Sequence, residues 1–462
     1  HGIELNSNWL IGMQKNRDPS SFRDPSGYIF FERGEIFRAI NQSYAKNYDL
    51  LMNCGLYDDL VKKGMLVSHK EVKSNDTYKT IQPELIKVIS YPYEWSFEQL
   101  KDVALCLLEI QKISMNFGMT LKDATPFNFQ FISNAPILID TLSFETYTEG
   151  QLWKPYQQFC ETILSPLLLA KHVDPKLLST MSVFKEGIPL KITSKMLPFK
   201  TKFMLSTALN IHAHARSQKK YAKKDTKIGK KLSKNSIIGI IDNLESLVKG
   251  ISISNEKTIW SEYYEETNYT DDSFQQKQSI IRKCLKKIKP SVVLDLGSNT
   301  GIFAEIAQEF TEHVIACDND HGVINKLYNK CKKEKSSILP LVLDITNPSP
   351  NIGWMNNERS GFFKRVNTDV VFALAIIHHI SISNNIPFEK IAEFFASITT
   401  NLIIEFVPKS DSQIQKMLLT REDIFNKYTQ ENFEKEMLEY FSIQEIFKID
   451  DSKRIIYYFK RL

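Results

Sequence analysis

An acidic residue and two glycines follow a short apolar run at residues 292–301, which read VVLDLGSNTG. Gly297 and Gly301 allow a sharp turn and a close approach of the backbone to a ligand. Asn299, between them, tolerates left-handed dihedral angles better than most residues. A dinucleotide prefers GxGxxG spacing, in which a helix N-terminus receives the pyrophosphate. Because Asp295 precedes the first glycine and would repel a phosphate, the pattern favours a ligand that carries positive charge.

Two more aspartates close the next two apolar runs. Asp318 ends HVIACD and is expected to accept hydrogen bonds from both hydroxyls of a ribose. Asp344 ends ILPLVLD and is expected to accept from an adenine amino group, while Ile345 packs on the ring. A single aspartate at such a place is commonly a turn cap. Three in succession instead favour S-adenosylmethionine (SAM), which has an ammonium and a sulfonium. Ser298 and Asn319, which lie in the turns after the first two strands, are also predicted to contact this cofactor.

A parallel sheet is needed to bring these acids together, and the C-terminal part of the chain has the corresponding pattern. Five apolar runs alternate with amphipathic segments such as FAEIAQEF, and they occupy residues 292–297, 313–318, 338–344, 369–375 and 401–407. Alternation of this kind predicts an α/β fold whose parallel sheet is covered on both faces and binds its ligand at the carboxyl ends of the strands. Two later runs, FSIQEIFKI and RIIYYFKR, predict an antiparallel hairpin at the sheet edge.

In this order, VVLDLGSNTG, ACDND, LVLDIT, DVVFALAIIHHI and LIIEFVP resemble the seven-stranded, Rossmann-like class I SAM-dependent methyltransferases over residues 255–462. Three segments, TIWSEYYEETNYTDDSFQQK, IIHHISISNNIPFE and IEFVPKSDSQIQKML, are more narrowly similar to bacterial methyltransferases of the nodulation protein NoeA kind. The resemblance implies SAM as the cofactor and an acceptor that the sequence does not identify.

The resemblance also places the end of the fourth strand against the methyl donor and the acceptor. Ala373 is therefore expected to line the cofactor site. His378 or His379 is a candidate catalytic base, because an imidazole titrates near neutral pH; the alternative is that one or both histidines are structural. Glu405, at the end of the fifth strand, is a further candidate for contact with the acceptor.

The segment 260–277 resembles the lid that such methyltransferases fold over the cofactor. Its aromatic residues are spaced too irregularly for a simple core helix. Lys277 would then meet the methionine carboxylate of SAM. The alternative is a surface lysine on a helix that leads to the sheet.

The first half of the chain has a second group of chemically suggestive residues. Asp123, Asn128 and Asp140 occur in LKDATPFNFQF and APILIDTLSFE, an order that resembles the core of a degenerate kinase-like fold. In that fold an aspartate acts as base, and the other two residues hold magnesium. The sequence departs from the pattern, because Asp140 is followed by Thr141 rather than glycine and no GxGxxG is present. The alternative is an unrelated α+β domain in which these residues cap loops.

Composition sets limits on the class of protein. The 462 residues are too many for one ordinary domain, and 42% hydrophobic with 24% charged residues is typical of a globular protein. The six cysteines form no CxxC pair, which argues against a zinc site, and no metal is therefore predicted. Cysteines scattered in this way are typical of a cytoplasmic protein. No apolar run is long enough to predict a transmembrane segment.

A basic stretch separates the two halves. Residues 216–234 contain nine lysines and arginines and one acid, Asp225. The stretch is either a solvated linker or a patch for an anionic partner. We expect an N-terminal α+β domain at 1–210 that recognises substrate or partner, a basic linker and helix at 211–254, and a methyltransferase domain at 255–462.

The leading hypothesis is a SAM-dependent methyltransferase. One alternative is a bifunctional kinase and methyltransferase acting on a glycan or a small molecule. Another is a non-catalytic SAM-binding scaffold.

Overall fold

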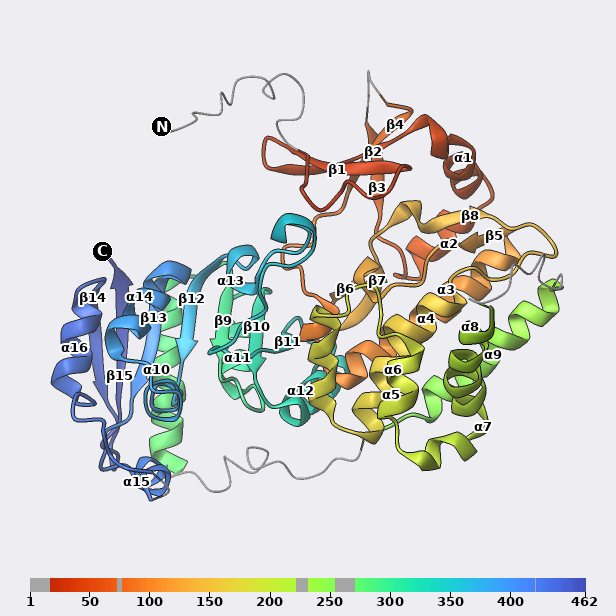
Figure 1. The fold of residues 1–462 in the computed structure, drawn as a ribbon. Coiled ribbons are helices and arrows are strands. Elements are labelled where there is room, and N and C mark those ends of the chain that lie inside the picture. Colours follow the sequence, from red (N-terminus) through yellow and green to blue (C-terminus); the bar gives the residue numbers. More distant parts are fainter. Residues whose placement is uncertain (1–16, 73–76, 222–231, 254–270, 420) are drawn as a thin grey trace, which may run out of the picture.

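The computed structural model describes residues 17–72, 77–221, 232–253, 271–419 and 421–462, and it has two regions that meet beside one edge of a large sheet (Figure 1). The first region contains a four-stranded antiparallel sheet of order β1-β2-β4-β3, two small two-stranded sheets and a group of helices. The second contains a seven-stranded sheet.

The strands of the first region are β1 (Gly27–Glu32), β2 (Glu35–Ile40), β3 (His69–Val72), β4 (Lys79–Pro83), β5 (Met119–Leu121), β6 (Phe129–Ile132), β7 (Ala135–Leu138) and β8 (Phe144–Thr146). Its helices are α1 (Ala45–Asn53), α2 (Leu56–Lys62), α3 (Phe97–Asn116), α4 (Tyr156–Phe159), α5 (Ser165–His172), α6 (Leu190–Met196), α7 (Leu205–Thr207), α8 (His214–Tyr221) and α9 (Lys234–Gly250).

The second region has the strands β9 (Val293–Leu296), β10 (Val314–Asp318), β11 (Leu339–Val342), β12 (Thr368–Ala373), β13 (Thr399–Phe406), β14 (Phe441–Lys448) and β15 (Ile455–Arg461). Its helices are α10 (Asp271–Ile288), α11 (Ile302–Gln308), α12 (His321–Glu334), α13 (Phe362–Arg365), α14 (Phe388–Ile398), α15 (Ser412–Leu418) and α16 (Gln430–Leu438).

The large sheet has the order β11-β10-β9-β12-β13-β15-β14. The first five strands are parallel, and β15 pairs antiparallel with both β13 and β14. The predicted α/β fold, with five parallel strands and a terminal hairpin, is therefore confirmed for this region. From β9 the chain adds β10 and β11 on one side, and it then adds β12 and β13 on the other side of β9. Such a reversal of strand order creates a crevice at the carboxyl ends of the strands.

Alternate residues of these strands enter different cores, as the two-residue period of a strand requires. Leu294 and Val371 face one side, where α14 and α16 pack, while Val293 and Val370 face the other, where α10 and α11 pack. The near-continuous apolar runs of the sequence follow from this burial on both faces.

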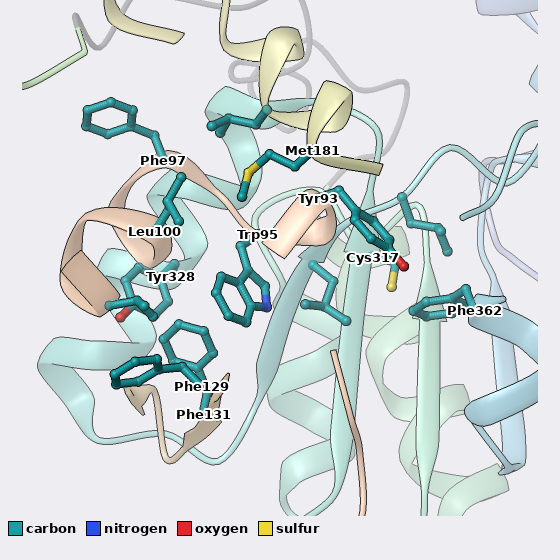
Figure 2. Packing of buried hydrophobic residues seen from close by; sticks show 14 of the residues in the cluster. Tyr93, Trp95, Phe97, Leu100, Phe129, Phe131, Met181, Cys317, Tyr328 and Phe362 are labelled. Carbon is teal, nitrogen blue, oxygen red and sulfur yellow. The ribbon is translucent and has the colours of Figure 1, made fainter. Parts of the chain in front are cut away.

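The apolar core on the first of these sides continues into the N-terminal region. Trp95 packs edge-on against Phe131, with ring centroids 5.1 Å apart, and Phe131 packs edge-on against Tyr328 of α12 at 5.9 Å. Figure 2 shows Trp95 among these aromatic rings, with Cys317 of β10 close by. The two regions thus share one continuous hydrophobic core.

Polar contacts complete this interface. Tyr328 donates a hydrogen bond to Asp102 of α3 at 2.6 Å, and the Asn134 amide donates to the carbonyls of Ser336 and Ile338 at 2.8 and 2.9 Å. Arg365 of α13 forms a buried ion pair with Glu94, which is fully shielded from solvent. Breaking such a pair leaves an uncompensated buried charge, so the interface resists separation.

A 3-10 helix at Pro92–Glu94 precedes α3, and its Pro92 fixes the backbone and removes a hydrogen-bond donor. The segment 211–254, expected to be a basic linker and helix, contains α9. This helix packs on α3, where Lys112 pairs with Glu245 at 2.5 Å.

Parts of two predicted features lie outside the described residues. Residues 222–231 of the basic stretch and residues 260–270 of the expected lid belong to this group. In the described part of the chain, no helix combines the length and the apolar character required to cross a bilayer.

Candidate functional site

A cavity of about 330 Å³ opens at the carboxyl ends of β9, β10, β11 and β12, where the strand order reverses. Nine of its lining residues come from the turns that follow these strands: Gly297, Asn299, Asp318, Asn319, Asp344, Ile345, Leu374, Ala375 and Ile376. The other side is formed by Phe274, Lys277, Phe303, His379, Ile380, Ser383, Asn384 and Arg454, among others. This is the place where open α/β sheets bind ligands.

The glycine corner after β9 adopts the expected left-handed geometry. Gly297 has φ +74° and Asn299 has φ +48°. A Cβ at Gly297 would overlap the side chain of Ile376, which lines the cavity, so the corner admits only glycine without rearrangement. Gly301, with φ +88°, caps α11, and a Cβ there would lie 2.5 Å from Leu327.

Asp318, at the end of β10, is held in place by the backbone. Its two carboxylate oxygens accept hydrogen bonds from the amides of Asn299 and Asp320, each at 3.0 Å. Burial raises the pKa of Asp318, although these amides oppose the shift. The carboxylate is thus fixed at the cavity wall with lone pairs left over, as a pair of ribose hydroxyls requires.

Asp344 and Ile345 line the neighbouring part of the cavity, after β11. Asp344 accepts from the amide of Thr346 at 2.8 Å and from its hydroxyl at 2.7 Å. These bonds fix the turn so that a carboxylate and an aliphatic side chain stand together at the wall, alongside Asn319 of the next turn.

Besides Glu405, five residues of the sequence-predicted set are buried beside the cavity and are not among the described residues that line it: Asp295, Ser298, Gly301, Ala373 and His378. Asp295 illustrates the reason. It lies within the central strand β9, where successive side chains point to opposite faces of the sheet rather than toward the strand end. Burial and the nearby charge of Asp318 raise its pKa to about 7, and its Oδ2 has no hydrogen-bond partner among the described residues. These five shape or polarise the wall from behind it.

The two predicted histidines differ in position. His379 lines the cavity, whereas His378 is fully buried behind it, and their ring centroids are 4.2 Å apart. Burial and the charge of Arg454 lower the pKa of His379 to about 4. Its imidazole is therefore neutral at physiological pH.

Glu405 is placed differently from the expectation. It is fully buried, accepts from Lys277 at 2.5 Å and lies 3.7 Å from Arg454, and it is not among the described residues that line the cavity. The structure therefore gives Glu405 a structural role beneath the floor of the cavity, instead of the predicted contact with an acceptor. Lys277 does line the cavity, but its ammonium is directed to Glu405 rather than left on a surface.

Sequence reasoning missed several lining residues, of which Arg454 is the most consequential. Arg454 directly precedes β15, and its Nε donates to Asp411 at 2.8 Å. The antiparallel pairing of β15 with β13 brings it next to the end of β13. No sequence motif near Arg454 indicates this pairing of β15 with β13.

The residues suspected in the first half also come together. The Asn128 amide donates to Asp123 at 3.0 Å and to Ser143 at 3.2 Å, and the Ser143 hydroxyl donates to Asp140 at 2.9 Å. Arg38 of β2 forms an ion pair with Asp140 at 2.6 Å. Burial and the charge of Asp140 raise the pKa of Asp123 to about 7.

Comparisons with known proteins extend these observations. No protein-family model matches the chain. The chain is similar to the N-methyltransferase NodS of Bradyrhizobium japonicum WM9, solved with S-adenosyl-L-homocysteine (SAH), at 12% identity and a TM-score of 0.31 over 44% of this chain and 99% of that one. It is also similar to magnesium protoporphyrin IX methyltransferase (ChlM) of Synechocystis PCC 6803, solved with SAH, at 17% identity and a TM-score of 0.31 over 45% and 100%.

A relative matches the chain over nearly its whole length. Nodulation protein NoeA of Rhizobium meliloti (strain 1021) is 33% identical over 460 residues, which cover 96% of each chain. Both regions of the fold, and the interface between them, fall within that match. The seven-stranded sheet has the strand order of class I SAM-dependent methyltransferases, and the chain as a whole belongs to the nodulation protein NoeA family.

Proposed function

We propose that this protein transfers a methyl group from SAM to an acceptor. The observation that carries the proposal is the cavity at the strand-order reversal, with the Asp318 carboxylate fixed at its wall beside a corner that only glycine fits. When bound, SAM supplies an electrophilic methyl group on a sulfonium.

Each lining residue has a role that its chemistry supports. Asp318 would accept from the ribose hydroxyls, and Asp344 from the adenine amino group while Ile345 packs on the ring. The buried Asp295, with Oδ2 unpartnered among the described residues, lies behind the glycine corner, where a cationic ligand would favour its ionised form.

His379 is the residue we propose as the base. It is the member of the predicted catalytic set that lines the cavity, and its low pKa keeps the imidazole neutral. A neutral imidazole can take the proton of an acceptor hydroxyl, or the proton that leaves the ammonium formed when an amine is methylated, while the alignment of the reacting atoms supplies most of the rate.

The binding experiment is calorimetric titration of the purified protein with SAH. The activity experiment incubates the protein with SAM labelled on the methyl group and fractionated lysate. Label is expected in one class of molecule, namely protein, nucleic acid, glycan or small molecule, which identifies the acceptor class. Binding of SAH without any transfer would instead favour a SAM-binding scaffold, and no binding would refute the proposal.

Phosphoryl transfer by the first region is a second candidate, and the contact of Asn128 with Asp123 beside Asp140 favours it. The ion pair from Arg38 to Asp140 argues against it, because a guanidinium there competes with magnesium. A thermal-shift measurement with ATP and Mg²⁺ distinguishes a bifunctional enzyme from a methyltransferase alone. Only the bifunctional enzyme must bind ATP and Mg²⁺ and so unfold at a higher temperature in their presence. Without a shift, the first region is left with a recognition role.

The location we propose is the cytoplasm. All six cysteines are within the described residues and are unpaired, and five of them are buried, which supports a reducing compartment. Detection of the native protein in a cytoplasmic fraction with alkylatable thiols would test it.

A further inference from the structure

A cluster of exposed apolar side chains lies on the first region, at α6, the 3-10 helix Phe199–Phe203, α7 and the π-helical turn Ala208–Ala213. We call this cluster the apolar face; it consists of Ile192, Met196, Phe199, Phe203, Met204, Leu205 and Leu209. These are seven of the 21 large hydrophobic residues that the described chain exposes, and they fall within one short segment. Phe203 and Leu205 are 78% and 75% exposed.

The segment is built with its polar residues inward. His212 is 2% exposed, and its two ring nitrogens form hydrogen bonds with the hydroxyls of Ser194 at 2.7 Å and Thr201 at 2.9 Å. Asn210, 4% exposed, is held by Tyr156 at 2.7 Å and Asn243 at 3.0 Å. Because the segment buries the side chains of His212 and Asn210, its phenylalanine and leucine side chains are held toward the solvent. Large exposed apolar patches mark interaction sites.

The charged residues within the segment that carries the apolar face have one sign. Lys191, Lys195, Lys200 and Lys202 are all exposed along the same segment, and none of them has an ion-pair partner among the described residues. The sequence contains no acid between Glu186 and Asp225. The Lys202 ammonium lies 4.7 Å from the centre of the Phe199 ring, so cation and apolar ring share one surface.

We propose that the apolar face docks this protein onto an anionic lipid bilayer. Phenylalanine and leucine side chains enter the boundary between headgroups and acyl chains, while interleaved lysines contact anionic headgroups. A nucleic acid would use the lysines but leave the leucines without a role. The protein would lie on the bilayer rather than cross it. This inference does not depend on the proposed function, because no residue of the apolar face lines the cavity.

Co-sedimentation with vesicles tests the proposal in the full-length protein. The probes are vesicles of phosphatidylcholine alone and of phosphatidylcholine with phosphatidylglycerol in equal amounts. Binding is expected to the anionic vesicles and to be much weaker on the neutral ones. Phe203→Ser/Leu205→Ser should reduce binding at least about tenfold through lost apolar burial. Lys200→Glu/Lys202→Glu should reduce it by about fivefold or more for each lysine.

Matched controls lie at the far end of the molecule, near α16 (Figure 1). Leu438→Ser/Leu462→Ser removes two exposed apolar side chains there, and Lys390→Glu/Lys435→Glu reverses two exposed lysines. Both should bind anionic vesicles as the unchanged protein does. Absence of vesicle binding, equal loss in the controls, or binding to RNA in place of vesicles would each overturn the proposal.

Discussion

The ammonium of Lys277, which lines the cavity, lies 2.5 Å from the carboxylate of Glu405, which is fully buried beneath it. Arg454, a second lining residue, lies 3.7 Å from the same carboxylate and 2.8 Å from Asp411, so two cations and two anions share one site at the cavity floor. The group joins α10, the end of β13, the loop before α15 and the start of β15. It therefore fixes the floor of the cavity by connecting elements that are distant in sequence.

Removal of Glu405 should be far more damaging than removal of the whole pair. Glu405→Ala leaves Lys277 as a buried charge without this partner, and we expect the free energy of unfolding to fall by about 3–5 kcal/mol in urea denaturation. In Lys277→Met/Glu405→Leu both charges are gone, and most of the stability should return. If the double variant is as unstable as the single one, the pair does more than neutralise charge.

Asp318 and Asp320 provide a matched test of the ribose contact. Asp318→Ala removes a charged acceptor at the cavity wall and should weaken SAH binding by about 10- to 100-fold in calorimetry. Asp320→Ala removes the cap of α12, which accepts from Gly322 and Val323, and should cost about 1 kcal/mol of stability with little change in SAH affinity. Equal affinities for the two variants would contradict the assignment of Asp318.

Gly297 and Gly118 separate backbone strain from steric overlap. Both have φ +74°, but a Cβ at Gly118 meets no atom within 4 Å, whereas one at Gly297 overlaps Ile376. Gly118→Ala should therefore cost about 1–2 kcal/mol of stability from the left-handed dihedral alone. Gly297→Ala should cost a further 1–3 kcal/mol, roughly, and should also weaken SAH binding by displacing the cavity wall. Unchanged SAH affinity in Gly297→Ala would show that the corner is not part of the cofactor site.

Patterns within one strand or turn were sufficient to predict much of the second region. The apolar runs, the corner at Gly297 and the acids Asp318 and Asp344 are each encoded within a few residues, and the parallel sheet then brings them together. The contribution of Arg454 could not be foreseen, because it arises from the antiparallel pairing of β15 with β13. Glu405 was misplaced for a related reason, since its burial depends on Lys277, which is distant in the sequence.

The first region was less predictable from local patterns. The 20-residue helix α3 begins at a capping box of Ser96 and Gln99, which is a local signal. The packing of Trp95 through Phe131 onto Tyr328 has no sequence signal, because it joins residues of both regions.

His379 gives a prediction about pH that can be separated from its role in catalysis. Its pKa is about 4 in the folded protein and near 6.5 when unfolded, so the unfolded chain binds a proton first as the pH falls. The stability due to this residue is complete above pH 6.5 and is lost toward pH 4, on the order of 3 kcal/mol. His379→Gln should flatten the dependence of unfolding free energy on pH over this interval and should also lower methyl transfer. His321 has a pKa of about 4 through burial too but is not among the described residues that line the cavity, so His321→Gln should flatten the stability curve and leave transfer intact. Full transfer by His379→Gln would make the His378–His379 pair structural, and the base would have to be sought elsewhere.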